Sequence, residues 1–507
     1  MNISKKINNI VIKLKNLFFK NDKKINLPRK AIRGGFWVLA LKIIGGLFNL
    51  ARIIIIARVL APHDFGLMGI ALLTIGILEV FSQTGFQSAL IQKKKDIKSY
   101  LDSAWTVSIL RGFVLFTILY FLAPCAALFF KTPIATSIIR TVGLSILLQA
   151  FTNIAVVYFQ KELEFNKQFF YQLSGILADF VVAVSLAIIF KNVWALVFGL
   201  LAGNFVRLIL SYFIHPYRPH FTKNFKKAKE LFVFGKWVLG SSIIIFLTTQ
   251  GDDVLVGKIL GITMLGFYQM AYKISNLPAT QITHVISQVT FPTYSKLQNN
   301  LPKLRKAYLR VLQLTGLLSI PLAGIIIILS PEFIKIFLGH KWMPMATSMQ
   351  ILAIWGAVRS IGATSGGLFY SKGRPDIVTK LTMIKLIILS LLIYPLTKIW
   401  GLPGTSLAVV GAALFSSPIG SYIVIKKIIK CKIWSFCKQI IFPLIATIAM
   451  MLIVLLTKNI LGATNIFNFF ILVIIGALVY VTSILIIDYF SKYNIKLLLK
   501  NILRSIK

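Results

Sequence analysis

The chain contains few acidic residues and few cysteines. Its 507 residues include 14 Asp and Glu against 56 Lys and Arg, and only three cysteines. Cys431 and Cys437 fall in or beside a connection predicted to be cytoplasmic, where thiols stay reduced, so we predict no disulfide framework. A membrane-embedded glycosyltransferase or polymerase is disfavoured, because it would need acidic residues on a sizeable outer loop. The longest predicted outer connection, about 331–345, holds one acid, Glu332.

Nucleotide-binding and metal-binding motifs are also missing from the sequence. No GxxxxGK[ST] loop occurs, and no soluble domain is large enough for a nucleotide-binding fold. The five histidines show no zinc-protease spacing. We therefore expect no cofactor, no metal ion and no enzymatic activity. Nucleic-acid binding is not expected either, because the net charge of +42 has no soluble domain in which to concentrate.

Long apolar runs dominate what is present. Apolar residues make up 57% of the chain, and runs of about 20 such residues match a hydrocarbon core roughly 30 Å thick. The sequence predicts an all-α polytopic membrane protein with about 14 transmembrane helices. The expected spans are residues 34–57, 66–91, 104–130, 134–159, 169–190, 193–214, 231–256, 264–290, 308–330, 346–370, 377–397, 402–425, 438–457 and 466–487.

Basic residues predict the orientation of these helices. Thirty-six Lys and Arg residues fall in the termini and alternate connections, and eight fall in the connections on the opposite side. Cytoplasmic loops carry an excess of Lys and Arg, so we expect both termini on the cytoplasmic side of the membrane. Residues 3–20 alternate Lys with apolar residues at helical spacing, which predicts an amphipathic helix lying on anionic lipid headgroups.

An internal repeat organises the chain. Residues 35–71 align without gaps to residues 235–271, with ten identities in 37 positions. Six helices separate the copies, so two pseudo-symmetric six-helix lobes related by an axis along the membrane normal are expected. The predicted parts are a basic amphipathic segment (1–30), an N-lobe (31–214), a cytoplasmic linker (215–230), a C-lobe (231–425), helices 13 and 14 (426–488) and a basic tail (489–507).

Charged residues inside the predicted spans are the best candidates for function, because each costs roughly 2.5–3.5 kcal/mol at helix centre. Lys42, Asn49 and Arg52 lie on one stripe of helix 1, and their repeat partners include Thr249 and Asp252. We predict that Arg52 and Asp252 line one substrate cavity, although two charges that merely hold helices together would show the same pattern. The other predicted cavity residues are Glu79, Gln83, Lys273, Asn276 and Arg359.

Four acids are placed at membrane depth: Glu79, Asp179, Asp252 and Asp253. Any of them could carry a coupling proton or sodium ion, because burial favours protonation of a carboxylate. Each could equally be a static partner for a basic residue such as Arg52, Lys42 or Lys273. We favour a static ion-pair role for Asp253, and we expect Glu79 and Asp252 to line the substrate cavity.

Several segments resemble one known family. The stretch ARVLAPHDFGLMGIA from Ala57, followed by FSQTGFQSALIQKKKD from Phe81, is similar to a signature of Wzx-type polysaccharide flippases. LGFYQMAYKISNLPATQI from Leu265, FPTYSKLQ from Phe291 and GRPD from Gly373 resemble the same family in order. The resemblance implies the polysaccharide-transport branch of the multidrug/oligosaccharidyl-lipid/polysaccharide exporter superfamily.

This resemblance implies a specific function. Members move undecaprenyl-pyrophosphate-linked sugar units across the bacterial cytoplasmic (inner) membrane by alternating access. Besides membrane lipids, a polysaccharide polymerase or export machinery is a candidate partner. Intramembrane Lys and Arg would offset the diphosphate charge. A multidrug or small-solute cation-coupled antiporter of the same superfamily is the alternative, for which a more acidic or aromatic cavity is expected. A scaffold subunit without transport activity is a further one.

Overall fold

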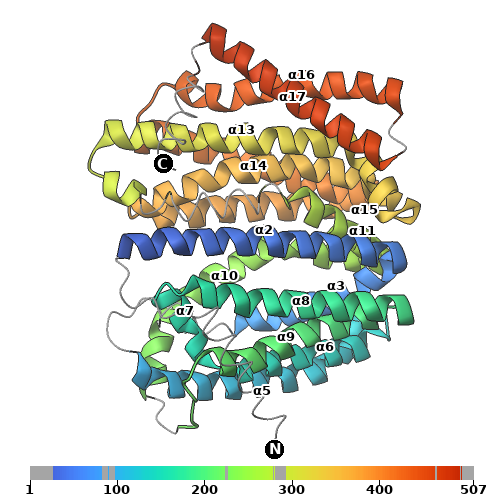
Figure 1. Cartoon of the computed structure of the whole chain (residues 1–507), viewed down its shortest axis with the longest axis vertical. Coiled ribbons are helices and arrows are strands. Elements are labelled where there is room, and N and C mark those ends of the chain that lie inside the picture. The colour runs from blue at the N-terminus through green and yellow to red at the C-terminus, as the bar shows by residue number, and fades with distance from the viewer. Residues whose placement is uncertain are drawn as a thin grey trace, which may run out of the picture. The chain divides into compact units, whose positions relative to one another are not determined.

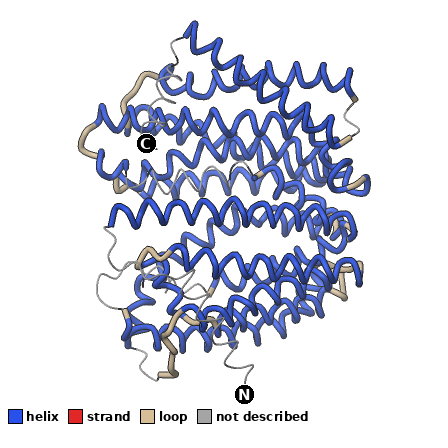
Figure 2. Tube along the Cα trace, in the orientation of Figure 1, coloured by secondary structure: helices blue, strands red, loops and turns tan. Residues whose placement is uncertain are grey.

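Helices make up all of the regular structure that is described. The structure is a computed structural model, and it describes residues 27–82, 90, 97–222, 226–277, 279, 290, 293–462, 465–491 and 493. Within these ranges every regular element is a helix, as Figure 2 shows along the trace. The predicted all-α class is therefore confirmed.

The chain divides into two compact units between residues 243 and 244, inside helix α10. The helices up to this division are α2 (Leu27–Val59), α3 (Pro62–Phe81), α5 (Lys98–Phe129), α6 (Ala135–Phe151), η1 (Ile154–Val156), α7 (Val157–Lys161), α8 (Phe165–Phe190), α9 (Trp194–Ile214) and α10 (Lys226–Ile259). Those that follow are α11 (Ile262–Ser275), α13 (Leu301–Phe333), η2 (Ile334–Leu338), η3 (His340–Met345), α14 (Ala346–Ser371), α15 (Pro375–Ile423), η4 (Val424–Ile428), α16 (Ile433–Leu461) and α17 (Ile466–Ser491).

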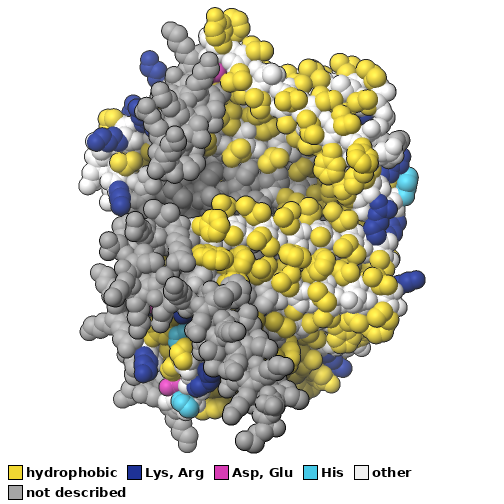
Figure 3. All heavy atoms as spheres, viewed as in Figure 1, with side chains coloured by type: hydrophobic (Ala, Val, Ile, Leu, Met, Phe, Trp, Pro, Cys, Tyr) yellow, Lys and Arg dark blue, Asp and Glu magenta, His cyan; other side chains and the backbone are white. Residues whose placement is uncertain are grey.

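Many of these helices are long and apolar enough to cross a membrane. Nine pass that test among the described residues, or ten if the bent pair 135–151 and 154–161 forms one span. Figure 3 shows hydrophobic side chains covering most of the visible described surface, and Phe121 and Leu391 are each at least 70% exposed. Soluble proteins do not expose so large an apolar surface to water, so this is a multi-pass membrane protein. The count of fourteen stays a prediction.

The internal repeat includes a helix break. Helix α2 ends at Val59 and α3 begins at Pro62; 200 residues later α10 ends at Ile259 and α11 begins at Ile262. Pro62 suits the first turn because a helix does not use the N–H group at that position. Gly261 has a φ of +90° at the second break, a conformation that glycine adopts without steric cost.

A second glycine divides the longest helix. Helix α15 contains two of the predicted spans, and Gly401, with φ +61° and ψ −134°, kinks the backbone between them. Pro403 follows two residues later and cannot donate a backbone hydrogen bond. Local sequence therefore accounts for the bend that separates the eleventh and twelfth predicted spans.

Small residues bring the helices of the first unit close together. Helices α8 and α9 lie side by side, with α6 and α5 beside them (Figure 1). A Cβ atom added to Gly203 of α9 would lie 2.8 Å from the backbone oxygen of Gly175 in α8. Without a hydrophobic drive inside lipid, such close backbone packing is a main source of helix association.

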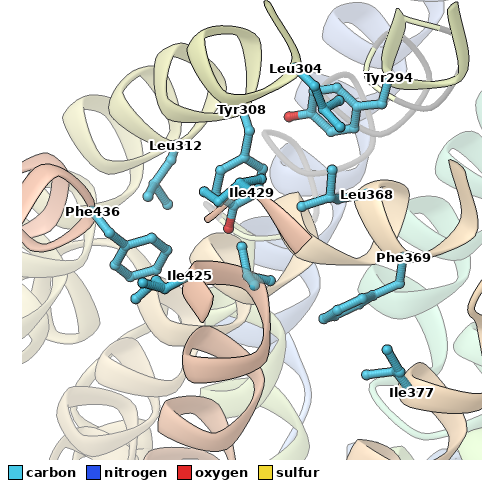
Figure 4. Packing of buried hydrophobic residues seen from close by; sticks show 11 residues of the cluster. Tyr294, Leu304, Tyr308, Leu312, Leu368, Phe369, Ile377, Ile425, Ile429 and Phe436 are labelled. Carbon is cyan, nitrogen blue, oxygen red and sulfur yellow. The ribbon is translucent and has the colours of Figure 1, made fainter. Parts of the chain in front are cut away.

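One end of the second unit contains an apolar core cluster. Its side chains come from α13, α14, α15, η4 and α16 and from residues just before α13 (Figure 4). Tyr308 is fully buried there, and its hydroxyl makes a 2.8 Å hydrogen bond with Ser365. This cluster fastens the five helix ends to one another.

The segment after α9 is anchored to the first unit. The Asp102 carboxylate, on α5, accepts hydrogen bonds from the Tyr217 hydroxyl at 2.6 Å and from the His220 backbone N–H at 2.8 Å. The Thr222 N–H donates to the Thr106 hydroxyl at 3.1 Å, and Phe221 packs on Trp105. Burial and the bond to Asp102 raise the pKa of the Tyr217 phenol, so it remains a donor at neutral pH.

We expect Tyr217→Phe to destabilise the first unit by about 1–2 kcal/mol, because a hydrogen bond to a charged group is lost. The thermal unfolding midpoint in detergent should fall accordingly. Tyr489→Phe is the matched control, since Tyr489 is 80% exposed and its substitution should leave the midpoint unchanged. Equal midpoints for both variants would contradict the anchoring role of Asp102.

Candidate functional site

The first unit contains an ion pair between two predicted site residues. The Arg52 guanidinium on α2 lies 3.0 Å from the Asp179 carboxylate on α8, and the side chains are only 17% and 22% exposed. Aromatic contacts between Trp37 and Phe169 hold the two helices together. The structure therefore gives Arg52 a carboxylate partner within its own unit, which is the static-partner alternative for Asp179.

Two glycines make room for this ion pair. A Cβ atom at Gly199 of α9 would lie 2.7 Å from the Asp179 carboxylate oxygen, and one at Gly203 would lie 3.1 Å from the Asp179 Cβ. Asp179 thus occupies a notch in α9, and side chains larger than glycine at these positions would collide with it. The sequence of α9 decides how deeply Asp179 can be buried.

The predicted stripe on helix 1 has two kinds of environment. Arg52 faces α8, and so does Gly45, which lies between Lys42 and Asn49 in the sequence, since a Cβ at Gly45 would lie 3.1 Å from Ile176. Asn49 is exposed and its amide donates to the Gly45 carbonyl of its own helix at 2.9 Å. Lys42 is half-buried. Part of the stripe therefore packs against α8, while Asn49 and part of Lys42 stay accessible.

Glu79 lies near the end of α3, beside an arginine that the sequence reasoning missed. Arg111 of α5 donates to the Glu79 backbone carbonyl at 3.3 Å and to the Ser82 hydroxyl at 2.8 Å, and it interacts electrostatically with the Glu79 carboxylate. Arg111 lies inside the predicted span 104–130, so a search for charged residues within the spans could have identified it. Gln83 lies outside the described residues.

The second unit buries two adjacent acids of α10. Asp252 is 2% exposed and accepts a 2.7 Å hydrogen bond from the Tyr268 hydroxyl of α11. Asp253 is 8% exposed, interacts electrostatically with Asp252 and hydrogen-bonds with Gln269. Helix α11 therefore supplies a polar partner to each acid.

Four further residues extend this group toward α14 and α15. The Arg359 guanidinium of α14 donates to the side-chain oxygen of Asn276 at 3.4 Å. The Lys385 ammonium of α15 lies 3.8 Å from the ring centre of Trp355, a cation–π contact, and it lies within electrostatic range of Asp252 and Arg359. We call Asp252, Tyr268, Asn276, Trp355, Arg359 and Lys385 the C-unit polar cluster.

The structure thus brings Asp252, Asn276 and Arg359 together, and it adds Lys385. A lysine eight residues into the predicted span 377–397 met the criterion used for the other candidates, so the sequence did contain this signal. Thr249 donates to the Ile245 carbonyl of its own helix at 2.8 Å, and Lys273 is exposed. That Arg52 and Asp252 line one cavity stays a prediction.

A close helix contact positions the C-unit polar cluster. A Cβ atom at Gly356 of α14 would lie 2.5 Å from the backbone oxygen of Ser275 in α11. The Ser275 hydroxyl also donates to the Met349 carbonyl at 2.6 Å. Gly356 is one turn before Arg359, and Ser275 precedes Asn276, so this contact sets the spacing between Arg359 and Asn276.

We expect Gly356→Ala to destabilise the second unit by about 1–3 kcal/mol, because the added methyl group meets rigid backbone. The unfolding midpoint in detergent should fall. Gly362→Ala on the same helix is the control, since its Cβ would meet nothing within 4 Å and alanine favours helix. A Gly356→Ala midpoint equal to that of the control would show that α11 and α14 separate without cost.

Metal ligands do not gather in the part of the chain that the structure describes. No group of three or more His, Cys, Asp or Glu side chains there is arranged to hold a metal ion. The buried or half-buried groups are instead carboxylates, a guanidinium, an ammonium and phenols. Such a set can bind charged and hydroxyl-bearing molecules, and it can exchange protons.

The fold is shared with membrane transporters. It superposes with a structure titled "Lipid II flippase MurJ, inward closed conformation" at a TM-score of 0.71 and 19% identity, over 90% of this chain and 99% of that one. An inward-facing multidrug resistance MATE family transporter matches at a TM-score of 0.60 and 15% identity, over 78% of this chain and 98% of that one. The fold is therefore that of these membrane transporters, in agreement with the predicted all-α polytopic class.

The sequence comparison defines the family within that class. Residues 55–347 match the family described as "Polysaccharide biosynthesis protein", and the chain belongs to it. The lipopolysaccharide biosynthesis protein WzxC of Escherichia coli is 28% identical over 364 residues, covering 71% of this chain and 74% of that protein. The teichuronic acid biosynthesis protein TuaB of Bacillus subtilis is 25% identical over 301 residues, covering 59% and 62%. The predicted Wzx-type relationship is confirmed.

Proposed function

We propose that this chain is a flippase for undecaprenyl-pyrophosphate-linked oligosaccharides. It moves these units from the inner to the outer leaflet of a bacterial cytoplasmic membrane, with both termini in the cytoplasm, for use by a polysaccharide polymerase or export machinery. It transports its substrate without changing it chemically. Family membership and relatives named for polysaccharide biosynthesis support this proposal.

The observation that carries the proposal is the pair of cations in the C-unit polar cluster. Arg359 lies about 18 Å along α14 from its end at Ser371, and Lys385 about 15 Å along α15 from its start at Pro375. These depths are near the middle of a hydrocarbon core roughly 30 Å thick. A cation at that depth is costly unless it has a partner, and a lipid diphosphate crossing the membrane needs such a partner there.

Transport by alternating access requires the two lobes to exchange conformations, with binding energy or an ion gradient shifting the balance. Among the four candidate coupling acids, Asp179 already neutralises Arg52. Asp252 accepts a hydrogen bond from a neutral tyrosine. We therefore propose Asp252 for the coupling role, with Glu79 and Asp253 as further candidates.

The test is a strain whose surface polysaccharide depends on this chain. Its depletion should make lipid-linked repeat units accumulate on the cytoplasmic face, where they are inaccessible to reagents added outside, and re-expression should restore export. Drug sensitivity with normal polysaccharide would instead support the alternative function as a multidrug antiporter; the MATE neighbour is named as a multidrug resistance transporter. Unchanged lipid intermediates together with unchanged polysaccharide would refute the flippase.

A further inference from the structure

A cavity of about 520 Å³ lies within the second unit, between α14, α15 and α16. Its walls are mostly apolar, and Phe369 and Phe436 belong both to these walls and to the core cluster shown in Figure 4. These two residues are near the ends of α14 and α16 that meet in that cluster. The cavity therefore starts near one end of the unit.

The other end of the cavity is cationic. Arg359 and Lys385 both line it, and none of the described residues that line it is acidic. The hydroxyl-bearing residues of its wall are Ser365, Thr382, Ser416, Ser417 and Ser421. The cavity thus extends from an apolar end near Phe369 to two positive charges near the middle of the membrane.

Glycines hollow the wall that α14 contributes. Gly362 and Gly366, one turn apart, both line the cavity, and a Cβ atom at either position would meet nothing within 4 Å. Gly356 on the same helix is different, because its Cβ would strike the α11 backbone. Helix contact therefore does not require glycine at positions 362 and 366, which instead leave open volume beside the two cations.

The chemistry of this space favours an anionic amphiphile. A free phosphate ion would leave the long apolar wall empty, and an uncharged lipid would bring no negative charge to Arg359 and Lys385. A free sugar would leave most of the wall, which is apolar, without a matching surface. A volume of about 520 Å³ lies within the range of pockets that bury organic ligands of moderate size.

We propose that the cavity binds the phosphate-bearing end of a polyprenyl carrier lipid. The phosphate contacts Arg359 and Lys385, and the first isoprene units pack along the apolar wall toward Phe369 and Phe436. This inference rests on the proposed function and adds to it a defined site within the C-terminal unit. Because Lys385 is also within electrostatic range of Asp252, an arriving phosphate would compete with that acid for the ammonium group.

The test measures binding of undecaprenyl phosphate to the purified full chain in detergent, by native mass spectrometry. The wild type should retain this lipid in preference to undecaprenol and to inorganic pyrophosphate. We expect Lys385→Gln to weaken binding about tenfold, and Gly366→Leu to weaken it at least as much by filling the cavity. Gly35→Leu is the matched control, because a Cβ at this helical glycine of the other unit also meets nothing within 4 Å.

Each outcome has a definite meaning. Equal retention of undecaprenol would show that the cations do not recognise the lipid, and displacement of the lipid by inorganic pyrophosphate would indicate a site for free anions; either result overturns the proposal. Unchanged binding to Gly366→Leu, with its unfolding midpoint intact, overturns it as well. Specific binding by a chain whose depletion leaves export unaffected would refute the flippase function while the lipid site stands.

Discussion

Arg359→Gln is expected to reduce polysaccharide export by about thirtyfold or more at unchanged protein level. Truncating one member of a buried charged contact costs about 2–5 kcal/mol, and each 1.4 kcal/mol corresponds to about tenfold. Glutamine keeps a hydrogen-bond donor for Asn276 but loses the charge, so the loss of export would report on electrostatic contact with substrate. The measurement is polysaccharide release by the depletion strain complemented with each variant.

Two controls make this result specific. Arg359→Lys keeps the charge and should retain more export than Arg359→Gln. Arg310→Gln removes an exposed arginine of α13 and should export normally. If Arg359→Gln exports at the wild-type rate, the C-unit polar cluster is not part of the transport path.

Asp179→Ala is expected to destabilise the first unit by about 2–3 kcal/mol. Removing one partner of a fully buried ion pair costs about 3–5 kcal/mol, and we lower that figure because Arg52 and Asp179 remain 17% and 22% exposed. The variant leaves the Arg52 guanidinium without its carboxylate between α2 and α8. The unfolding midpoint in detergent should fall.

A charge exchange separates a structural from a transport role. In the double variant R52D/D179R the pair is restored, so its midpoint should lie above those of both single variants. If the pair only holds α2 against α8, export by the double variant should recover together with its unfolding midpoint. Asp376→Ala is the control, because its ion pair with Arg374 is exposed and worth less than about 1 kcal/mol. A double variant no more stable than the single ones would contradict direct pairing.

Much of the fold could be predicted because it follows from local composition. Apolar runs define helices in a membrane, since every backbone polar group there must be satisfied within its own segment. The breaks before Pro62 and at Gly401 also follow from single residues whose backbone preferences are strong. The repeat was visible because the two copies share ten identities in 37 ungapped positions, and both copies contain a helix break at the same place.

The candidate site was predictable only in part. Intramembrane charge identified Arg52, Asp179, Asp252 and Arg359, and applied evenly it would have identified Lys385 too. The contacts between these residues could not be predicted from the sequence, because α2 and α8 are separated by more than 100 residues, as are α10 and α15. Whether two such residues meet depends on how deeply their helices pack, which glycines such as Gly199 and Gly356 control.

The amino-acid sequence by itself determined that the chain is a membrane-embedded helical protein with an internal repeat, because hydropathy and backbone preference act over short segments. The tertiary structure alone decided that Arg52 pairs with Asp179, that Lys385 joins Arg359 at one cavity, and that glycines keep this cavity open. Those outcomes depend on how the helices pack, because packing decides which side chains of different helices meet in space.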